Sequence, residues 1–331
     1  MKRVYYLDVT KVVGIILVVF VAHAKTFMND KLSIIYHLYD IVGTLGVPLF
    51  VLVSGALILN KTSLTNWKGV KFFYLHNLIT IWVTAEIWIV VFYLITSNNY
   101  SIKELSMNML LINKPADHLW YIRMIVTYYF VLPAISYLLR SKNTEYLLWM
   151  ISLLVLCFTF FFNGYHMLFN NGLVSSPKLS YFCYLIYFLL GYFISNRYFK
   201  KIPLWAIVVL FILPLLFLYF YLGQENIFLW YDNPLILLSS IGLFELLRRT
   251  TIDNEDAKRK KFVITLSKMS FGIYLSHFLI LEVIRKMNLF YKDWSDVSIF
   301  LITGFASFIF SILLMKICGV SKLLSRALFR F

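Results

Sequence analysis

The chain has 331 residues, of which 61% are hydrophobic, 19% aromatic and only 14% charged, with a mean hydropathy of +0.78. This composition excludes a soluble globular protein, because it leaves too little polar surface to cover a fold of this size. The formal net charge of +15 would suggest nucleic acid as a partner of a soluble protein. In a membrane protein the charge is assessed segment by segment, and we predict no nucleic-acid partner.

Apolar runs of about 20 residues, the length of a helix that crosses about 30 Å of hydrocarbon, recur along the whole chain. The first run carries Asp8 and Lys11 and lacks a small-x-small cleavage site, so it is predicted to be a retained span and not a signal peptide. We predict an all-α polytopic bundle in a lipid bilayer, with about ten transmembrane helices in a single integral-membrane domain over 1–331 and no appended soluble domain. The predicted spans are 9–24, 38–59, 72–96, 119–139, 146–162, 179–197, 203–222, 228–247, 262–284 and 297–318.

Basic residues near the span ends predict the orientation. With the N-terminus inside, the inner segments hold 20 Lys and Arg residues and the outer loops hold eight. This excess favours N-in and C-in. The polar stretch 248–261 then lies on the inner side, where it contacts either anionic lipid headgroups or the phosphates of a cytosolic donor.

Ionisable residues within spans are the strongest functional signal, because each costs roughly 2.5–3.5 kcal/mol at the bilayer centre. Three histidines, His23, His118 and His277, come from separate spans and fall at similar depths toward the outer side. An imidazole can deprotonate a sugar hydroxyl for attack on an acyl group. Each histidine also has a structural alternative, as a boundary residue or as a hydrogen-bond partner of a neighbouring helix. No spacing typical of a metal site occurs, and we predict no metal.

Three other residues keep two interpretations each, and Glu86 enters as the partner of one of them. Arg123 must meet an anion, water or carbonyl oxygens, and either a structural pair with Glu86 or a contact to substrate satisfies it. Lys11 either pairs with Asp8, one turn away, or binds a donor at the inner mouth. Ser54, followed by a glycine, allows close approach of either a neighbouring helix or a ligand.

Four sequence blocks, taken together in order, resemble one known family. The blocks are "YYLDVTKVVGIILVVFVAHA", "GVPLFVLVSGALI", "HLWYIRMIVTYYFVLP" and "SFGIYLSHFLILEVI". They resemble the integral-membrane acyltransferase type 3 family. Within it, they are most similar to the stand-alone surface-glycan O-acetyltransferases, such as the one that acts on enterobacterial common antigen.

This resemblance implies a multi-pass enzyme of the bacterial cytoplasmic membrane. Such an enzyme takes an acyl group, usually acetyl from acetyl-CoA as donor substrate, and places it on a hydroxyl of an envelope polysaccharide or its lipid-linked precursor. It needs no permanently bound cofactor. The family's histidines correspond to His23, His118 and His277, its basic first-span residue to Lys11, and its His-Leu-Trp block extends to Trp120.

One spacing departs from the family pattern. The family usually has an arginine eleven residues before the first histidine, whereas Lys11 is twelve before His23. Twelve residues of α-helix rotate the histidine about 120° away from the lysine. A bulge or an unwound helix end would absorb the extra residue.

Two functions follow from these residues. In the first, O-acyl transfer, His23 is the general base, His118 or His277 orients the acceptor or polarises the thioester, and Lys11 and Arg123 hold phosphates or the developing oxyanion. In the second, the intramembrane charges and aromatic residues line the passage of a transporter or flippase of lipid-linked glycans. Acetyl and a larger acyl group both fit the sequence.

Overall fold

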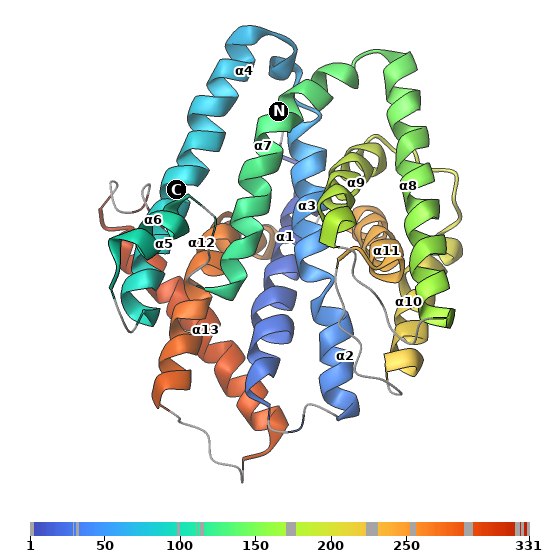
Figure 1. The fold of residues 1–331 in the computed structure, drawn as a ribbon. Coiled ribbons are helices and arrows are strands. Elements are labelled where there is room, and N and C mark those ends of the chain that lie inside the picture. The colour runs from blue at the N-terminus through green and yellow to red at the C-terminus, as the bar shows by residue number, and fades with distance from the viewer. Residues whose placement is uncertain are drawn as a thin grey trace. The chain divides into compact units, whose positions relative to one another are not determined.

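The fold is seen in a computed structural model of the chain (Figure 1). The structure describes residues 3–28, 30, 33–97, 100–110, 112, 116–169, 177–222, 231–251, 256–287, 294–321, 325, 328 and 329. Within these ranges, side chains are described except for those of 22–25, 62, 159–169, 177–183 and 221–222.

The described residues form helices and no strand, which confirms the all-α prediction. The α-helices are α1 (Tyr5–Ile16), α2 (Ile34–Gly43), α3 (Gly46–Ile58), α4 (Trp67–Phe73), α5 (Ile79–Thr96), α6 (Ile102–Met109), α7 (Trp120–Leu138), α8 (Lys142–Phe169), α9 (Pro177–Ser195), α10 (Leu204–Leu222), α11 (Pro234–Thr250), α12 (Ala257–Met287) and α13 (Asp296–Cys318). Short π or 3-10 segments are η1 (Leu17–His23), η2 (Ala24–Phe27), η3 (Thr62–Thr65), η4 (Tyr74–Leu78) and η5 (Asp117–Leu119).

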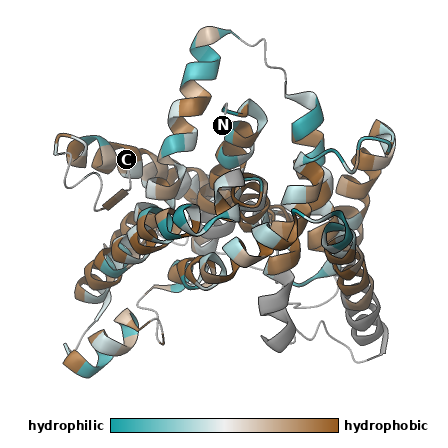
Figure 2. Ribbon diagram, turned by 90° about the horizontal axis from the view of Figure 1, so that it is seen from above, coloured by the Kyte–Doolittle hydropathy of each residue, from teal (hydrophilic) through white to brown (hydrophobic). Residues whose placement is uncertain are grey.

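Five helical stretches are long and apolar enough to cross a membrane, which indicates a membrane protein. In the part of the chain that the structure describes they are Ile34–Ile58, Trp67–Thr96, Asp117–Leu138, Ala257–Met287 and Asp296–Cys318. Each matches one of the predicted spans, and Figure 2 shows hydrophobic residues along most of the helices. The other five predicted spans fall on α1 with η1, on α8, α9 and α10, and on α11. For these, membrane crossing stays a prediction, as does the N-in orientation.

The chain divides into two compact units. Unit 1 comprises Met1–Asn60, Leu138–Ser270 and Phe290–Phe305, and unit 2 comprises Lys61–Tyr137, Phe271–Leu289 and Ala306–Phe331.

In unit 1, glycines let α3 and α9 pack backbone against backbone. A Cβ added to Gly55 would lie 2.0 Å from the carbonyl oxygen of Phe188, and one added to Gly191 would lie 2.0 Å from that of Leu52. Only a residue without a side chain permits this approach. The helix-packing interpretation of the Ser54-Gly55 pair is therefore confirmed for the glycine, while the Ser54 hydroxyl donates to the carbonyl of Phe50 one turn back, at 2.8 Å.

The helix that begins with α1 continues as the π-helix η1, which ends at His23. A π-helical segment holds more residues per turn than an α-helix, so it accommodates an inserted residue without breaking the helix. With one residue absorbed, the twelve residues from Lys11 to His23 turn like eleven, which leaves backbone position 23 about 20° from position 11. A bulge, one of the two predicted ways to absorb the extra residue, is thus present in this helix.

Candidate functional site

A large pocket opens in unit 1, lined by residues of α1, α3, α9, α11 and α12 and of the segments next to them. Its volume is about 860 Å³, within the range of roughly 300–1,000 Å³ that small-molecule sites occupy. It is lined by Arg3, Val4, Tyr5, Tyr6, Leu7, Asp8, Lys11, Ala56, Leu57, Asn60, Ser195, Asn196, Arg197, Arg248, Thr251, Ser267 and Lys268.

The lining of this pocket is strongly basic. Its charged residues are five cations, Arg3, Lys11, Arg197, Arg248 and Lys268, and one carboxylate, Asp8. A concave site with an excess of one sign of charge concentrates ligands of the opposite sign. The pocket therefore suits an anionic small molecule, and Lys11 lies in it, as the donor-binding interpretation predicts.

The single carboxylate of the lining is already engaged. Asp8 is 4% exposed and accepts hydrogen bonds from Arg3 Nε and Nη2, both at 2.7 Å, and from the Ser267 hydroxyl at 2.6 Å. The charge of Asp8 also acts on Lys11, so pairing with Asp8 and donor binding both stay predictions for Lys11. A fork of two guanidinium N–H groups matches a carboxylate better than a lysine one turn away does.

The residues that line the pocket come from segments that the predicted topology places on one side of the membrane. The start of α1, the end of α3, the segment after α9, the end of α11 and the first half of α12 all contribute lining residues. Alternating spans require these five segments to lie together, and in unit 1 they do. The basic segments predicted to lie on the inner side thus line one cavity in unit 1.

In unit 2, two of the predicted histidines lie side by side and are buried. His118, in η5 at the start of α7, is 2% exposed, and His277 of α12 is 0% exposed. Their ring centroids are 5.4 Å apart, with the planes at 72°. His118 also stacks on Phe278, at 4.6 Å and 24°. The alternative that His118 is an interfacial boundary residue is wrong, because a boundary residue keeps its polar end in water.

Hydrogen bonds orient this histidine pair. His277 Nδ1 lies 2.8 Å from the carbonyl oxygen of Tyr274 and 3.1 Å from that of Ile273, so it carries the proton, since a carbonyl oxygen only accepts. In the neutral ring, Nε2 then holds the lone pair that can accept a proton. The Tyr274 hydroxyl donates to the main-chain carbonyl of His118, which ties η5 to α12.

The other predicted site residues have local partners. Arg123 Nη2 donates to the carbonyl oxygen of Ile112 at 3.0 Å, one of the three kinds of partner expected for it. Glu86 accepts from Trp82 Nε1 at 2.6 Å, one turn earlier on α5. Trp120 packs edge-on to Tyr121, with ring centroids 6.1 Å apart. For His23, the structure places the backbone at the end of η1 in unit 1.

A comparison with known families decides the class of protein. A family model described as an acyltransferase domain matches residues 4–316, nearly the whole chain. The chain belongs to this acyltransferase family. No curated protein and no solved structure matches it. The match supports acyl transfer as the activity of this acyltransferase, and nothing in the comparison supports the transport alternative.

Four pocket residues of the acyltransferase were not among the predicted site residues. Arg3, Arg197, Arg248 and Lys268 were counted only as basic residues of inner segments. That count was the one signal available, because these residues come together only when helices distant in sequence pack. Lys11 was found because a lysine within an apolar run is unusual in itself.

Proposed function

We propose that this acyltransferase transfers an acetyl group from acetyl-CoA to a hydroxyl of a cell-envelope polysaccharide or its lipid-linked precursor, in the cytoplasmic membrane of a bacterium. The observation that carries the choice of donor is the basic pocket of unit 1. Coenzyme A bears a diphosphate and a phosphomonoester, and the latter alone carries about −1.5 to −2 charges at pH 7. Five cations against one paired carboxylate suit such a ligand.

The proposed reaction is a single acyl transfer. A base takes the proton of the acceptor hydroxyl, and the oxygen attacks the thioester carbonyl carbon. The carbon–sulfur bond breaks, the new ester forms, and the coenzyme A thiolate leaves and takes up a proton. Coenzyme A is a substrate in this scheme, and no permanently bound cofactor takes part.

Proton transfer and charge stabilisation are assigned to the residues that the sequence singled out. His23 is proposed as the general base. His277 presents Nε2 as a proton acceptor through the hydrogen bond of Nδ1 to Tyr274, and with His118 it orients the acceptor or polarises the thioester. A positioned base of this kind contributes about 10²–10⁴-fold to the rate.

The test uses the purified full chain in lipid nanodiscs, with acetyl-CoA labelled in the acetyl group and envelope glycan as acceptor. We expect label in the glycan and one free coenzyme A thiol for each acetyl transferred. His23→Ala and His277→Ala should each lower kcat by about 10²–10⁴-fold. The matched control is His76→Ala, because His76 lies exposed on η4 and stacks on Phe72, so its loss should leave the rate unchanged.

Two outcomes would contradict the proposal. Absence of acetyl transfer from labelled acetyl-CoA would exclude this donor. Transfer at the wild-type rate in both His23→Ala and His277→Ala would exclude the assigned residues. In cells, deletion of the gene should remove the mass of one acetyl group per modified sugar from an envelope glycan, which also identifies the acceptor.

A further inference from the structure

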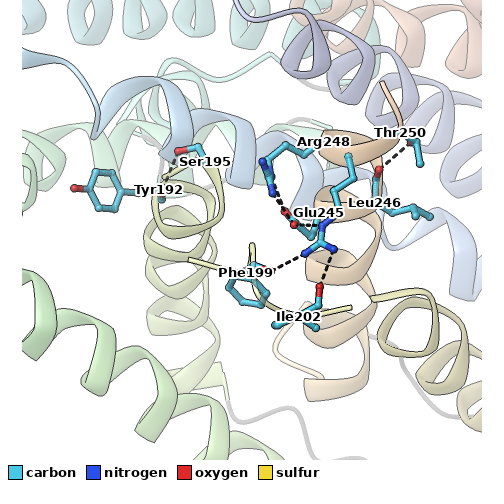
Figure 3. A network of polar contacts seen from close by, with 9 residues as sticks. Tyr192, Ser195, Phe199, Ile202, Glu245, Leu246, Arg248 and Thr250 are labelled. Carbon is cyan, nitrogen blue, oxygen red and sulfur yellow. Dashed lines mark hydrogen bonds and ion pairs between the residues drawn. The ribbon is translucent and has the colours of Figure 1, made fainter. Parts of the chain in front are cut away.

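A buried carboxylate, Glu245 of α11, lies behind the basic pocket and holds two arginines. It is 0% exposed and accepts hydrogen bonds from Arg248 Nε at 2.6 Å, Arg248 Nη2 at 2.7 Å and Arg249 Nε at 2.5 Å. One carboxylate cannot neutralise two guanidinium groups, so the cluster keeps a positive charge. Figure 3 shows the carboxylate of Glu245 facing Arg248. Burial of a carboxylate costs free energy, which these charge-assisted hydrogen bonds offset while they hold the two arginines in place.

The first of these arginines, Arg248, lines the pocket directly. Glu245 accepts hydrogen bonds from Nε and Nη2 of the Arg248 guanidinium group. Nη1 of Arg248 donates no hydrogen bond to a described residue. Because the group is planar and rigid, fixing one edge fixes the direction of the other. The edge formed by Nη1 and Nη2 is the one that binds a phosphate with two parallel hydrogen bonds. The bonds to Glu245 also raise the pKa of Arg248, which therefore stays charged.

The second arginine, Arg249, affects the pocket indirectly, through the backbone segment to which it donates hydrogen bonds. Its Nη1 donates to the carbonyl of Ile202 at 2.8 Å and its Nη2 donates to that of Phe199 at 2.6 Å. These carbonyls belong to the segment between α9 and α10, whose first residues include the pocket-lining Arg197. Through Arg249, Glu245 fixes that segment too.

We propose that Glu245 is the positioning residue of the donor pocket, which holds Arg248 with its open edge toward a phosphate of the donor and, through Arg249, holds the segment that carries Arg197. The inference rests on the proposed function, because it takes acetyl-CoA as the ligand of the pocket. Glu245 itself touches no donor atom in this arrangement. Its effect is on donor affinity, through the geometry of two cations.

The experiment compares two donors with the purified full chain. Acetyl-CoA carries the nucleotide phosphates, whereas S-acetylpantetheine has the same thioester without them. Glu245→Gln keeps the side-chain shape but loses the charge. It should raise KM for acetyl-CoA by roughly 10–100-fold, the range of a charge-assisted hydrogen bond, and leave kcat and the kinetics with S-acetylpantetheine within about twofold of wild type.

The direction of the change in KM for acetyl-CoA distinguishes a positioning role of Glu245 from a purely electrostatic one. Removal of a carboxylate adds one positive charge near the pocket, so a purely electrostatic effect would tighten the binding of acetyl-CoA. A merely structural role would impair both donors alike. The matched control is Glu282→Gln, since Glu282 also pairs with an arginine, Arg285, but belongs to unit 2 and does not line the pocket, and its KM values should match those of the wild type.

Arg248→Lys is the second variant and decides the matter if Glu245→Gln does not fold. Lysine keeps the charge but lacks the two N–H edges with which arginine can bond to Glu245 and to a phosphate at once. The variant should therefore raise KM for acetyl-CoA and not KM for S-acetylpantetheine. Unchanged or tighter binding of acetyl-CoA in the folded variants would overturn the role of Glu245. A wild-type protein that does not bind acetyl-CoA at all would overturn the proposed function and this inference with it.

Discussion

Replacement of Arg197 by glycine should weaken donor binding while it stabilises the fold. Arg197 has φ of 65°, and it is the one residue other than glycine with positive φ among those described. It follows the end of α9, where its N–H donates to the carbonyl of Ile194 at 3.0 Å and that of Tyr198 donates to Phe193 at 3.2 Å. These two bonds form a Schellman motif, in which Arg197 has the left-handed position that glycine usually fills.

The expected magnitude follows from this geometry. A residue with a side chain loses about 1–2 kcal/mol in the left-handed region, and glycine avoids that cost. Glycine also loses more backbone entropy on folding, about 0.5–1 kcal/mol. Arg197→Gly should therefore stabilise the fold by about 0.5–1 kcal/mol. Arg197→Ala keeps the unfavourable φ and so serves as the control for the loss of the guanidinium group.

Both variants lose one of the five cations of the pocket. Because Arg197 is exposed, its hydrogen bond to a phosphate belongs at the low end of the usual range, and KM for acetyl-CoA should rise about tenfold in each variant. Thermal unfolding in detergent measures the stability, and the acetyl-transfer assay measures KM. The reasoning is refuted if Arg197→Gly unfolds at a lower temperature than Arg197→Ala, or if neither variant changes KM.

Three further predictions concern packing, ion pairing and salt. Gly55→Ala should destabilise the protein by about 1–3 kcal/mol, because the new Cβ would lie 2.0 Å from the Phe188 carbonyl oxygen. Gly14→Ala is the control and should cost less, because its Cβ would have its nearest contact at 3.2 Å. Equal unfolding temperatures of the two variants would contradict this prediction. Asp8→Asn removes the anion that holds Arg3 and should lower the free energy of unfolding by about 1–2 kcal/mol. Thermal unfolding measures this, and an unchanged Tm would show that the Arg3–Asp8 pair contributes nothing to stability. An increase in salt from about 0.05 to 0.5 M screens the charges of the pocket and should raise KM for acetyl-CoA severalfold, but not KM for S-acetylpantetheine. Equal salt dependence of the two KM values would argue against phosphate binding in the pocket.

The positions of the helices could be predicted from the sequence because their signal is local. Long apolar runs predicted the five stretches that are able to cross a membrane, with ends within a few residues of those observed. A bulge such as the π-helix η1 was predictable, since the spacing from Lys11 to His23 is one residue longer than in the family pattern. The subdivision of runs into helices such as α2 and α3 was not, because it depends on local backbone geometry within one apolar segment.

Partners distant in sequence were not predictable. Asp8 has Lys11 one turn away, but its carboxylate accepts from Ser267, which is 259 positions later, and from Arg3. The burial of His118 depends on α12, whose Phe278 stacks on its ring. A single sequence gives the residue types and their depth order along each helix, whereas these contacts arise from how the helices pack.

The way the pocket's cations are held bears on the alternative that the basic inner segments only face lipid headgroups. Headgroups are mobile and abundant, so exposed lysines and arginines in any orientation satisfy them. Arg3 and Arg248, however, are each held by a carboxylate, Asp8 at 4% exposure and Glu245 at 0%. The hydrogen bonds that offset the burial of these two carboxylates also fix the two guanidinium groups in direction, which contact with mobile headgroups does not require. A fixed direction for two pocket cations therefore favours a ligand with phosphates at defined positions, as in coenzyme A, over a headgroup surface.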